Sequence, residues 1–218
     1  MSITQALLSF ALIAALLTII PGLDTALVLR SAISRGGRYA LATALGINTG
    51  ALVWGIAAAV GASALLATSE VAYRILTLAG AAYMVIFGVT LFYKSFCRQP
   101  QVVALVPVGA PARRPLGRGD LATAWATGVG TNLLNPKVGI FYLATIPQFI
   151  PAGVNPLLMG ILLALVHNVF GLLWAGLIIG STKIAARWLA SPAVTKITDR
   201  VTGTVLVGFG LKLAIWPN

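Results

Sequence analysis

The fold of this chain is decided by residues 3–29, which read ITQALLSFALIAALLTIIPGLDTALVL. A helix needs about 20 predominantly apolar residues to cross the hydrocarbon core of a bilayer, and the part of this stretch before Pro21 has nearly that length. Pro21 removes a backbone donor and Gly22 loosens the chain, so the helix is expected to break there. The stretch therefore predicts a membrane-spanning helix with an interruption, after which a new half-helix begins near Asp24.

Five further apolar stretches follow. They cover residues 40–66, 71–92, 121–150, 156–182 and 194–216, and the stretch 121–150 is interrupted at Asn135-Pro136. Of all residues, 59% are hydrophobic and 9% are charged, whereas soluble domains contain about 45–50% and about 25%. This composition excludes an ordinary soluble globule, a disordered chain and a coiled coil. We predict an all-α integral membrane protein with six transmembrane helices, of which helices 1 and 4 are broken.

The longest connector, residues 94–120, divides the chain into two halves. It contains four prolines, several glycines and five bases. Such a composition is typical of a flexible linker, and its one apolar piece, residues 102–108, is too short to span a membrane. The expected organisation is a first three-helix half over residues 1–93, a basic cytoplasmic linker over 94–120 and a second three-helix half over 121–218.

The basic residues indicate the topology. The chain has 15 lysines and arginines against four acids, and its net charge is +11. Twelve bases fall in alternate loops: Arg30, Arg35, Arg38, Lys94, Arg98, Arg113, Arg114, Arg118, Lys183, Arg187, Lys196 and Arg200. Only Arg74 and Lys212 fall on the opposite side, and Lys137 lies inside a span. Because cytoplasmic loops are enriched in Lys and Arg, we predict that both termini lie outside. This topology accounts for the charge without nucleic acid.

The predicted topology gives the two halves opposite orientations. Taken as a unit, the first three spans begin outside and end inside. The last three, taken as a unit, begin inside and end outside. Each half also opens with a span broken by a proline, Pro21 in the first and Pro136 in the second. Inverted repeats with paired helix breaks are typical of secondary transporters, whose binding sites lie at the breaks. We therefore expect two inverted halves with a binding site where Pro21, Gly22 and Pro136 come together.

Asp24 follows the first break and has two interpretations. It could simply cap the new half-helix by accepting hydrogen bonds from free backbone N–H groups. Serine or asparagine would cap equally well, whereas an intramembrane carboxylate costs about 2.5–3.5 kcal/mol at mid-bilayer on insertion scales. The functional interpretation is that Asp24 binds a substrate ammonium group or the coupling proton.

Lys137 follows the second break, in the sequence Asn132-Leu-Leu-Asn135-Pro136-Lys137. Proline suits the first turn of a helix and Asn135 is a plausible cap. A lysine in that turn adds its charge to the positive end of the helix dipole, and together they make an anion site. Lys137 could instead pair with Asp24 and hold the two breaks together. The functional interpretation is that Lys137, with Asn135 and Asn132, binds a substrate carboxylate, so that the acid and the base match a zwitterion.

Other polar residues within the spans have ordinary explanations. The single histidine, His167, is predicted to be a packing residue, with a proton relay as the alternative. Asn48 and Asn132 are typical of hydrogen bonds between helices, and Tyr142, Gln148 and Trp174 are candidates for lining a cavity. Two small-residue motifs, Gly46-xxx-Gly50 and Gly176-xxx-Gly180, permit close helix approach and could serve a homo-oligomer interface. One Cys excludes an internal disulfide framework, and one His excludes a His-rich metal site.

The chain resembles the lysine-exporter (LysE/RhtB) family of amino-acid translocators. The resemblance rests on an ordered set of motifs that covers nearly the whole chain: PGLDTALVLR (21–30), RGGR (35–38), ALGINTG (44–50), LAGAAYM (78–84), TG (127–128), NLLNPK (132–137), Phe141 and PQF (147–149). One position departs from the family, whose first break is usually Pro-Gly-Pro, because Leu23 stands where the second proline would be.

The resemblance implies a secondary exporter of amino acids or close derivatives in the bacterial inner membrane, driven by protons. We expect alternating access, no cofactor and no enzymatic activity, with the lipid bilayer, an amino acid and the proton as partners. Asp24 is the one obvious intramembrane acid, which favours a neutral amino acid. The alternatives are an exporter of another metabolite, a metal-ion exporter, a non-transporting scaffold and an intramembrane protease that uses Ser63 with His167. The poor set of metal ligands and the missing Gly-x-Ser-Gly motif speak against the metal exporter and the protease.

Overall fold

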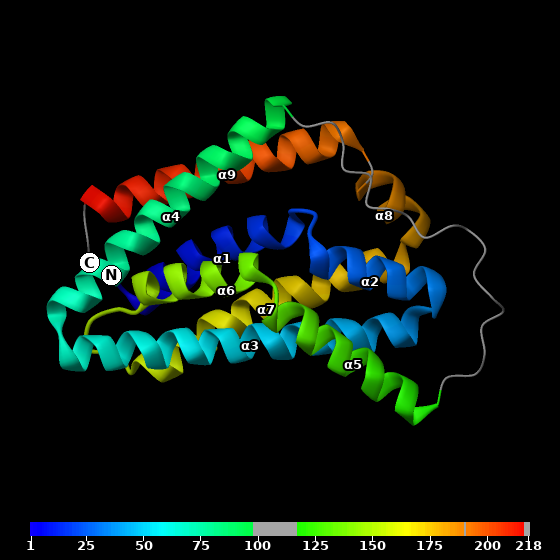
Figure 1. The fold of residues 1–218 in the computed structure, drawn as a ribbon, viewed down its shortest axis with the longest axis horizontal. Coiled ribbons are helices and arrows are strands. Elements are labelled where there is room, and N and C mark those ends of the chain that lie inside the picture. Colours follow the sequence, from blue (N-terminus) through cyan, green and yellow to red (C-terminus); the bar gives the residue numbers. More distant parts are fainter. Residues whose placement is uncertain (98–116, 190, 216–218) are drawn as a thin grey trace.

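The computed structural model describes residues 1–97, 117–189 and 191–215, and every regular element in these ranges is a helix (Figure 1). The elements are α1 (Ile3–Ile19), α2 (Leu23–Ser34), α3 (Gly37–Thr68), α4 (Glu70–Cys97), α5 (Arg118–Leu133), α6 (Pro136–Thr145), the 3-10 turn η1 (Ile146–Phe149), α7 (Pro156–Gly180), α8 (Thr182–Leu189) and α9 (Pro192–Ile215). The all-helical fold class is confirmed.

Both predicted breaks are present. The axis of α2 is bent by 54° from that of α1, and Gly22 is the N-cap residue of α2. At the second break, α5 ends at Leu133 and α6 begins at Pro136. The side chain of Asn135 caps α6 by accepting a hydrogen bond from the Lys137 N–H at 3.2 Å. Proline at the start of a helix and asparagine at its cap therefore act here as their chemistry predicts.

The chain runs back and forth along the long axis of the molecule (Figure 1). The pair α1–α2, then α4 and α7, run in one direction, and α3, the pair α5–α6 and α9 run in the other. Within the described residues, α3, α4 and α7 are each long and apolar enough to cross a membrane, and the bent pair α1–α2 makes a fourth candidate. The arrangement as six spans in two inverted halves, with both termini outside, stays a prediction.

The predicted loops differ from the structure at two places. An additional short helix, α8, occupies residues that the sequence reading treated as loop; it buries Ala185 and Leu189 and exposes Lys183 and Arg187. Helices α4 and α5 also extend a few residues into the predicted linker 94–120. The rest of that linker, with Arg98, Arg113 and Arg114, lies outside the described residues.

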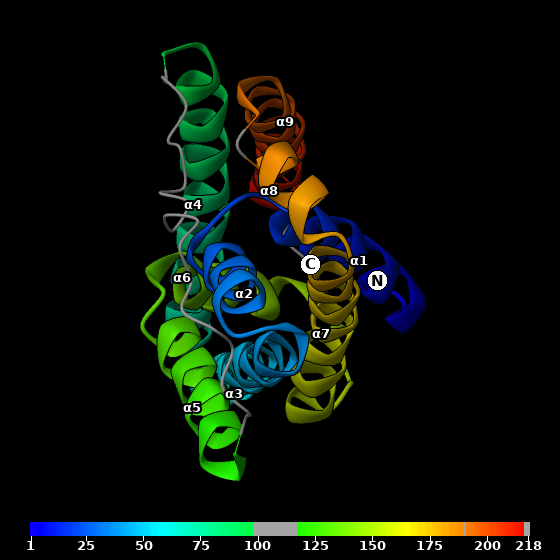
Figure 2. The ribbon, with the colours of Figure 1, turned by 90° about the vertical axis from the view of Figure 1, so that its right-hand side faces the viewer.

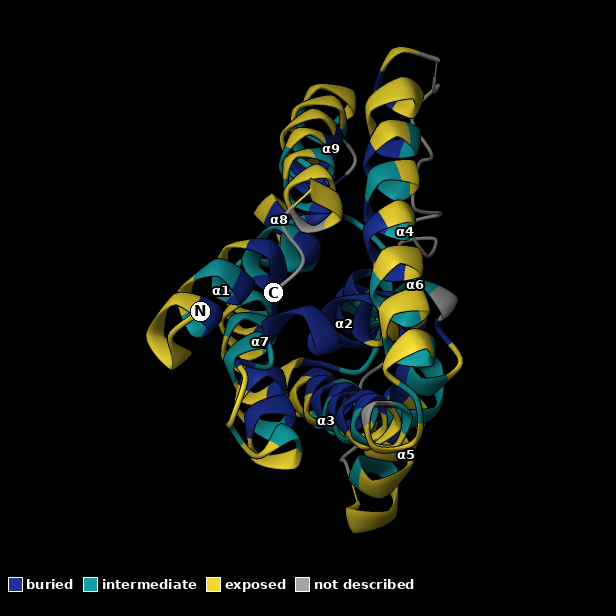
Figure 3. Ribbon diagram, turned by 90° about the vertical axis from the view of Figure 1, so that its left-hand side faces the viewer, coloured by how far each residue is buried: buried dark blue, intermediate teal, exposed yellow. Residues whose placement is uncertain are grey.

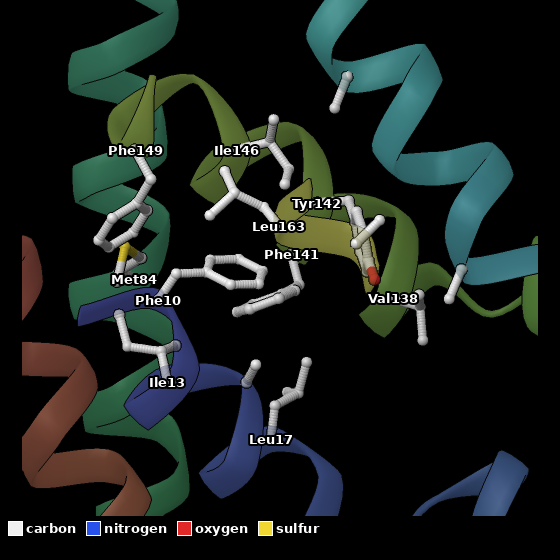
Figure 4. Close-up of a cluster of buried hydrophobic side chains, with 14 of the residues drawn as sticks. Phe10, Ile13, Leu17, Met84, Val138, Phe141, Tyr142, Ile146, Phe149 and Leu163 are labelled. Atoms are coloured by element: carbon white, nitrogen blue, oxygen red, sulfur yellow. The ribbon is translucent and has the colours of Figure 1, made fainter. Parts of the chain in front are cut away.

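An aromatic cluster forms part of the core between α1, α4, α6 and η1 (Figure 4). The ring of Phe10 in α1 lies 6.1 Å from that of Phe141 in α6 and 5.7 Å from that of Phe149 in η1. Met84 of α4 packs against the same group. The outward faces of α4 and α9 are largely exposed (Figure 3), and many of the exposed side chains are large and apolar, such as Ile75 and Ile86. Such a surface suits a lipid environment.

Glycines allow two pairs of helices to touch through their backbones. A Cβ atom on Gly46 of α3 would collide with the carbonyl oxygen of Trp125 in α5. A Cβ on Gly88 of α4 would come within 2.6 Å of the Gly203 carbonyl oxygen in α9, and α4 and α9 lie side by side in both views (Figures 1 and 2). Gly46-xxx-Gly50 thus packs within the chain, whereas added Cβ atoms on Gly176 and Gly180 would meet nothing within 4 Å.

The contact between α3 and α5 yields a stability prediction. Gly46→Leu is expected to lower the melting temperature of the detergent-solubilised protein by about 5 °C or more, since overpacking costs about 1–3 kcal/mol and a backbone carbonyl cannot move aside easily. Gly61→Leu, on the same helix with nothing within 4 Å of an added Cβ, is the matched control and should stay within about 2 °C of wild type. Equal melting temperatures for the two variants would contradict this packing.

Candidate functional site

The two helix breaks face a common cavity of about 90 Å³. Its walls come from both breaks and from α3 and α7, and they mix apolar surface with a group of polar side chains. The polar members are Thr18, Asp24, Thr25, Asn48, Asn132, Asn135, Lys137, His167 and Asn168. All four sequence-predicted substrate contacts, Asp24, Asn132, Asn135 and Lys137, are therefore brought together. Secondary transporters bind small polar ligands at such helix breaks.

Asp24 connects the two breaks. It lies in the first turn of α2, and its carboxylate accepts a hydrogen bond from Asn132 Nδ2 at 2.8 Å and a longer one from Asn135 Nδ2 at 3.4 Å. Both amides belong to the second break, one at the end of α5 and the other at the cap of α6. The hydrogen bonds of the Asp24 carboxylate therefore go to donors from the opposite break, which is more than the capping interpretation predicts.

Lys137 has a different environment. Its backbone N–H is capped by Asn135, while its ammonium group reaches the first break, where a Cβ on Gly22 would lie 3.7 Å from Lys137 Nζ. In the described part of the chain, no ion pair joins Lys137 to Asp24, and no hydrogen bond to Nζ is found. The alternative in which the two residues simply hold the breaks together as an ion pair is therefore wrong. Asp24 still attracts the lysine charge across the cavity.

Asparagines complete the polar wall. Asn168 of α7 donates to the Asn48 carbonyl oxygen of α3 at 3.0 Å. The side-chain oxygens of Asn132 and Asn168 are buried and find no partner among the described residues. A Cβ atom on Gly50 would come within 2.8 Å of Asn132 Oδ1, so this oxygen is packed closely against Gly50. Buried acceptors without donors are rare, so the Asn168 oxygen is a candidate acceptor for a ligand.

His167 borders the cavity but already has a partner. The Tyr142 hydroxyl lies 2.8 Å from His167 Nδ1, and the two rings stack with their centroids 5.5 Å apart. Ser63 instead donates to the Ala59 carbonyl oxygen, so the serine–histidine dyad is not assembled. Of the other candidates, Trp174 lines the cavity and its indole N–H points to Thr25 Oγ1 at 3.4 Å, whereas Gln148 donates to the Thr77 carbonyl oxygen elsewhere.

Sequence reasoning missed one acidic residue near this site. Asp199 belongs to the basic segment at the start of the last predicted span, and in α9 its side chain is only 4% exposed. It lines a second cavity that also reaches Lys137, and it attracts the Lys137 charge together with Asp24. The available signal was its isolation, since Asp199 is the one acid in residues 183–200, a segment with four bases. No group of three metal-ligating side chains occurs within the described residues.

Comparison with known proteins identifies the family. The family model for the LysE type translocator matches residues 15–216. This chain belongs to the LysE family of translocators. The resemblance read from the sequence motifs is therefore confirmed, and the chain is a member of a family of membrane translocators.

Several relatives of this LysE-family translocator align over nearly their whole length. The uncharacterized membrane protein YrhP of Bacillus subtilis is 31% identical over 214 residues, which cover 97% of this chain and 99% of YrhP. A homoserine/homoserine lactone efflux protein of Salmonella typhimurium is 28% identical over 94% of each chain. A leucine efflux protein of Klebsiella pneumoniae is 25% identical over 95% of this chain and 93% of its own. No solved structure matches this translocator.

Proposed function

We propose that this translocator exports a small neutral amino acid, or a close derivative, from the bacterial cytoplasm across the inner membrane. The observation that carries the proposal is the pairing of opposite charges in one cavity. Asp24 is a carboxylate held by amide donors, and Lys137 is an ammonium group without a protein partner among the described residues. Together they match the ammonium and carboxylate groups of a zwitterion.

The carboxylate of the substrate is assigned to Lys137. The Nζ atom reaches the cavity near Gly22, and the start of α6 adds the positive end of a helix dipole. The ammonium group of the substrate is assigned to Asp24, with the buried Asn168 oxygen as a second acceptor. Buried donors and acceptors that a ligand completes give both affinity and selectivity, because an analogue that lacks either group leaves one charge unpaired.

A neutral side chain fits the remaining lining. The cavity wall contains one acid and one base, and both are used by the backbone groups of an amino acid. The rest of the wall is mostly apolar, from residues such as Val28, Ile47 and Ala51. Two relatives are named a homoserine/homoserine lactone efflux protein and a leucine efflux protein, and homoserine and leucine are neutral amino acids. These names support a neutral substrate over a dibasic one.

Transport is proposed to occur by alternating access and to be coupled to protons. Protonation of Asp24 would remove its attraction for Lys137 and for a bound ammonium group, which biases one conformation over another. The broken helices provide the joints at which such a change can occur. Export of a metal ion is less well supported, because the acid and the single His of this cavity form a poor ligand set.

The direct test is amino-acid efflux from cells. Bacteria that express the chain or an empty vector would be loaded with a mixture of dipeptides, which release many amino acids internally, and the external amino acids would be followed over minutes. We expect faster release of one or a few neutral amino acids, with the difference abolished by a protonophore. Identical release from both strains, with the protein verified in the membrane, would overturn amino-acid export. Faster release that persists with the protonophore would overturn proton coupling alone.

A further inference from the structure

A second cavity of about 470 Å³ lies behind the first break. It is bounded by the Ile20–Leu23 segment, the last turns of α4, the end of α8 and the first turns of α9. Its polar lining consists of Thr90, Lys94, Ser95, Lys137, Thr195, Lys196 and Asp199. In the predicted topology, the ends of α4 and α8 and the start of α9 all lie on the cytoplasmic side.

The two cavities share a thin wall. Ile20, Gly22, Leu23 and Lys137 line both of them. Ile20 and Gly22 lie in the non-helical segment between α1 and α2, and Leu23 is the first residue of α2. The fourth, Lys137, has one carboxylate in each cavity that attracts its charge, Asp24 in the first and Asp199 in the second. Lys137 is thus the one charged side chain that lines both cavities among the described residues.

The second cavity has the charge pattern of a site for small zwitterions or anions. Lys94 and Lys196 stand at its exposed rim, whereas Asp199 is buried. The two helices that carry these residues are braced, because Arg200 Nε donates to Ser95 Oγ at 3.1 Å and the guanidinium lies 4.3 Å from the Phe96 ring centroid. A rim of bases raises the local concentration of carboxylates, while the negative charge of Asp199 further inside attracts an ammonium group.

We infer that this second cavity is a cytoplasmic vestibule that binds the amino acid before it reaches the cavity of Asp24. The inference rests on the proposed function and adds a binding site to it. Lys94 and Lys196 attract the carboxylate, Asp199 orients the ammonium group, and Lys137 passes the carboxylate through the wall at the first break. Asp199 and Lys196 are then residues of substrate capture, and Asp24 and Lys137 are residues of the transport step.

Uptake into inside-out membrane vesicles tests the vestibule, because the cytoplasmic face is then outside and the substrate concentration is known. The probes are radiolabelled L-leucine and L-homoserine. Asp199→Asn and Lys196→Gln are expected to raise the KM about threefold or more and to leave Vmax within about twofold of wild type. Lys183→Gln is the matched control, since it removes an exposed charge on nearby α8 that does not line the cavity; its KM should not change.

Thiol labelling gives a second readout that does not depend on turnover. In a Cys97→Ser background, Thr195→Cys is expected to react with a membrane-impermeant thiol reagent in inside-out but not in right-side-out vesicles, and excess transported amino acid should slow the reaction. Lys183→Cys, exposed on the nearby α8 and outside the cavity, controls for protection that is unrelated to the site.

The outcomes separate the two proposals. If both Asp199→Asn and Lys196→Gln take up the amino acid with the wild-type KM, the vestibule is overturned and export is left intact. The same holds if the amino acid does not protect Thr195→Cys from labelling. Wild-type vesicles that accumulate no amino acid at all, while Thr195→Cys is labelled, would overturn the proposed function and the vestibule with it. If Asp199→Asn does not reach the membrane, Lys196→Gln and the labelling decide the question, because Lys196 is exposed.

Discussion

Replacement of Lys137 by glutamine is expected to lower amino-acid export by at least about 30-fold. The variant keeps most of the volume and polarity of the side chain but removes the charge that faces the substrate carboxylate. Truncating one partner of a buried, hydrogen-bonded charge pair costs about 2–5 kcal/mol, and every 1.4 kcal/mol corresponds to about tenfold. No other base lines the first cavity, so no neighbouring residue within the described part can take over.

The measurement is the initial rate of efflux at matched expression levels. Lys137→Arg, which retains the charge, should recover part of the activity, although the guanidinium is larger and differently shaped. Lys212→Gln, which removes an exposed charge in the last turn of α9, is the control for a general effect of net charge and should export at the wild-type rate. Export by Lys137→Gln within threefold of wild type would exclude this lysine from the binding site.

Asp24→Asn is expected to slow export at least about tenfold and to remove the dependence of the remaining export on the proton gradient. The amide oxygen can still accept the 2.8 Å hydrogen bond from Asn132, so the local structure should persist. What is lost is the ability to alternate between a charged and a neutral form, on which proton coupling depends. The separation of these two effects makes the variant more informative than Asp24→Ala.

This prediction is measured as efflux with and without a protonophore, in parallel with binding of the substrate to the purified variant. Glu70→Gln serves as the control, because Glu70 is an exposed acid in the first turn of α4 and lies outside both cavities. Undiminished export by Asp24→Asn that still responds to the protonophore would exclude Asp24 from substrate binding and from proton coupling.

Much of this architecture could be predicted from the sequence, because the strongest signals are local. The helical regions follow from the length of the apolar stretches, and both interruptions follow from the chemistry of proline and glycine. The convergence of Asp24 and Lys137 could also be anticipated, since paired breaks in opposed halves are typically adjacent. Short-range capping by Asn135 was likewise visible in the order Asn-Pro-Lys.

The features that were missed depend on contacts between distant segments. Asp199 reads as one acid in a basic segment, and its burial arises from the tertiary packing of α9, whose main neighbour is α4. Whether Asp24 and Lys137 form an ion pair is a question of a few ångströms, which apolar patterns do not resolve. The short helix α8 follows directly after α7, and an eight-residue amphipathic segment is too short for hydropathy to distinguish it from a loop.

The backbone contact between α4 and α9 has a consequence for how the protein is made. Gly88 and Gly203 are about 115 residues apart in the chain, and synthesis proceeds at about 5–20 residues per second. Helix α4 is therefore synthesised roughly 6–23 seconds before the matching part of α9, and its glycine face is uncovered during that time. During that interval the nascent chain depends on the insertion machinery or on lipid to cover that face, and a chain that ends before α9 would never bury it.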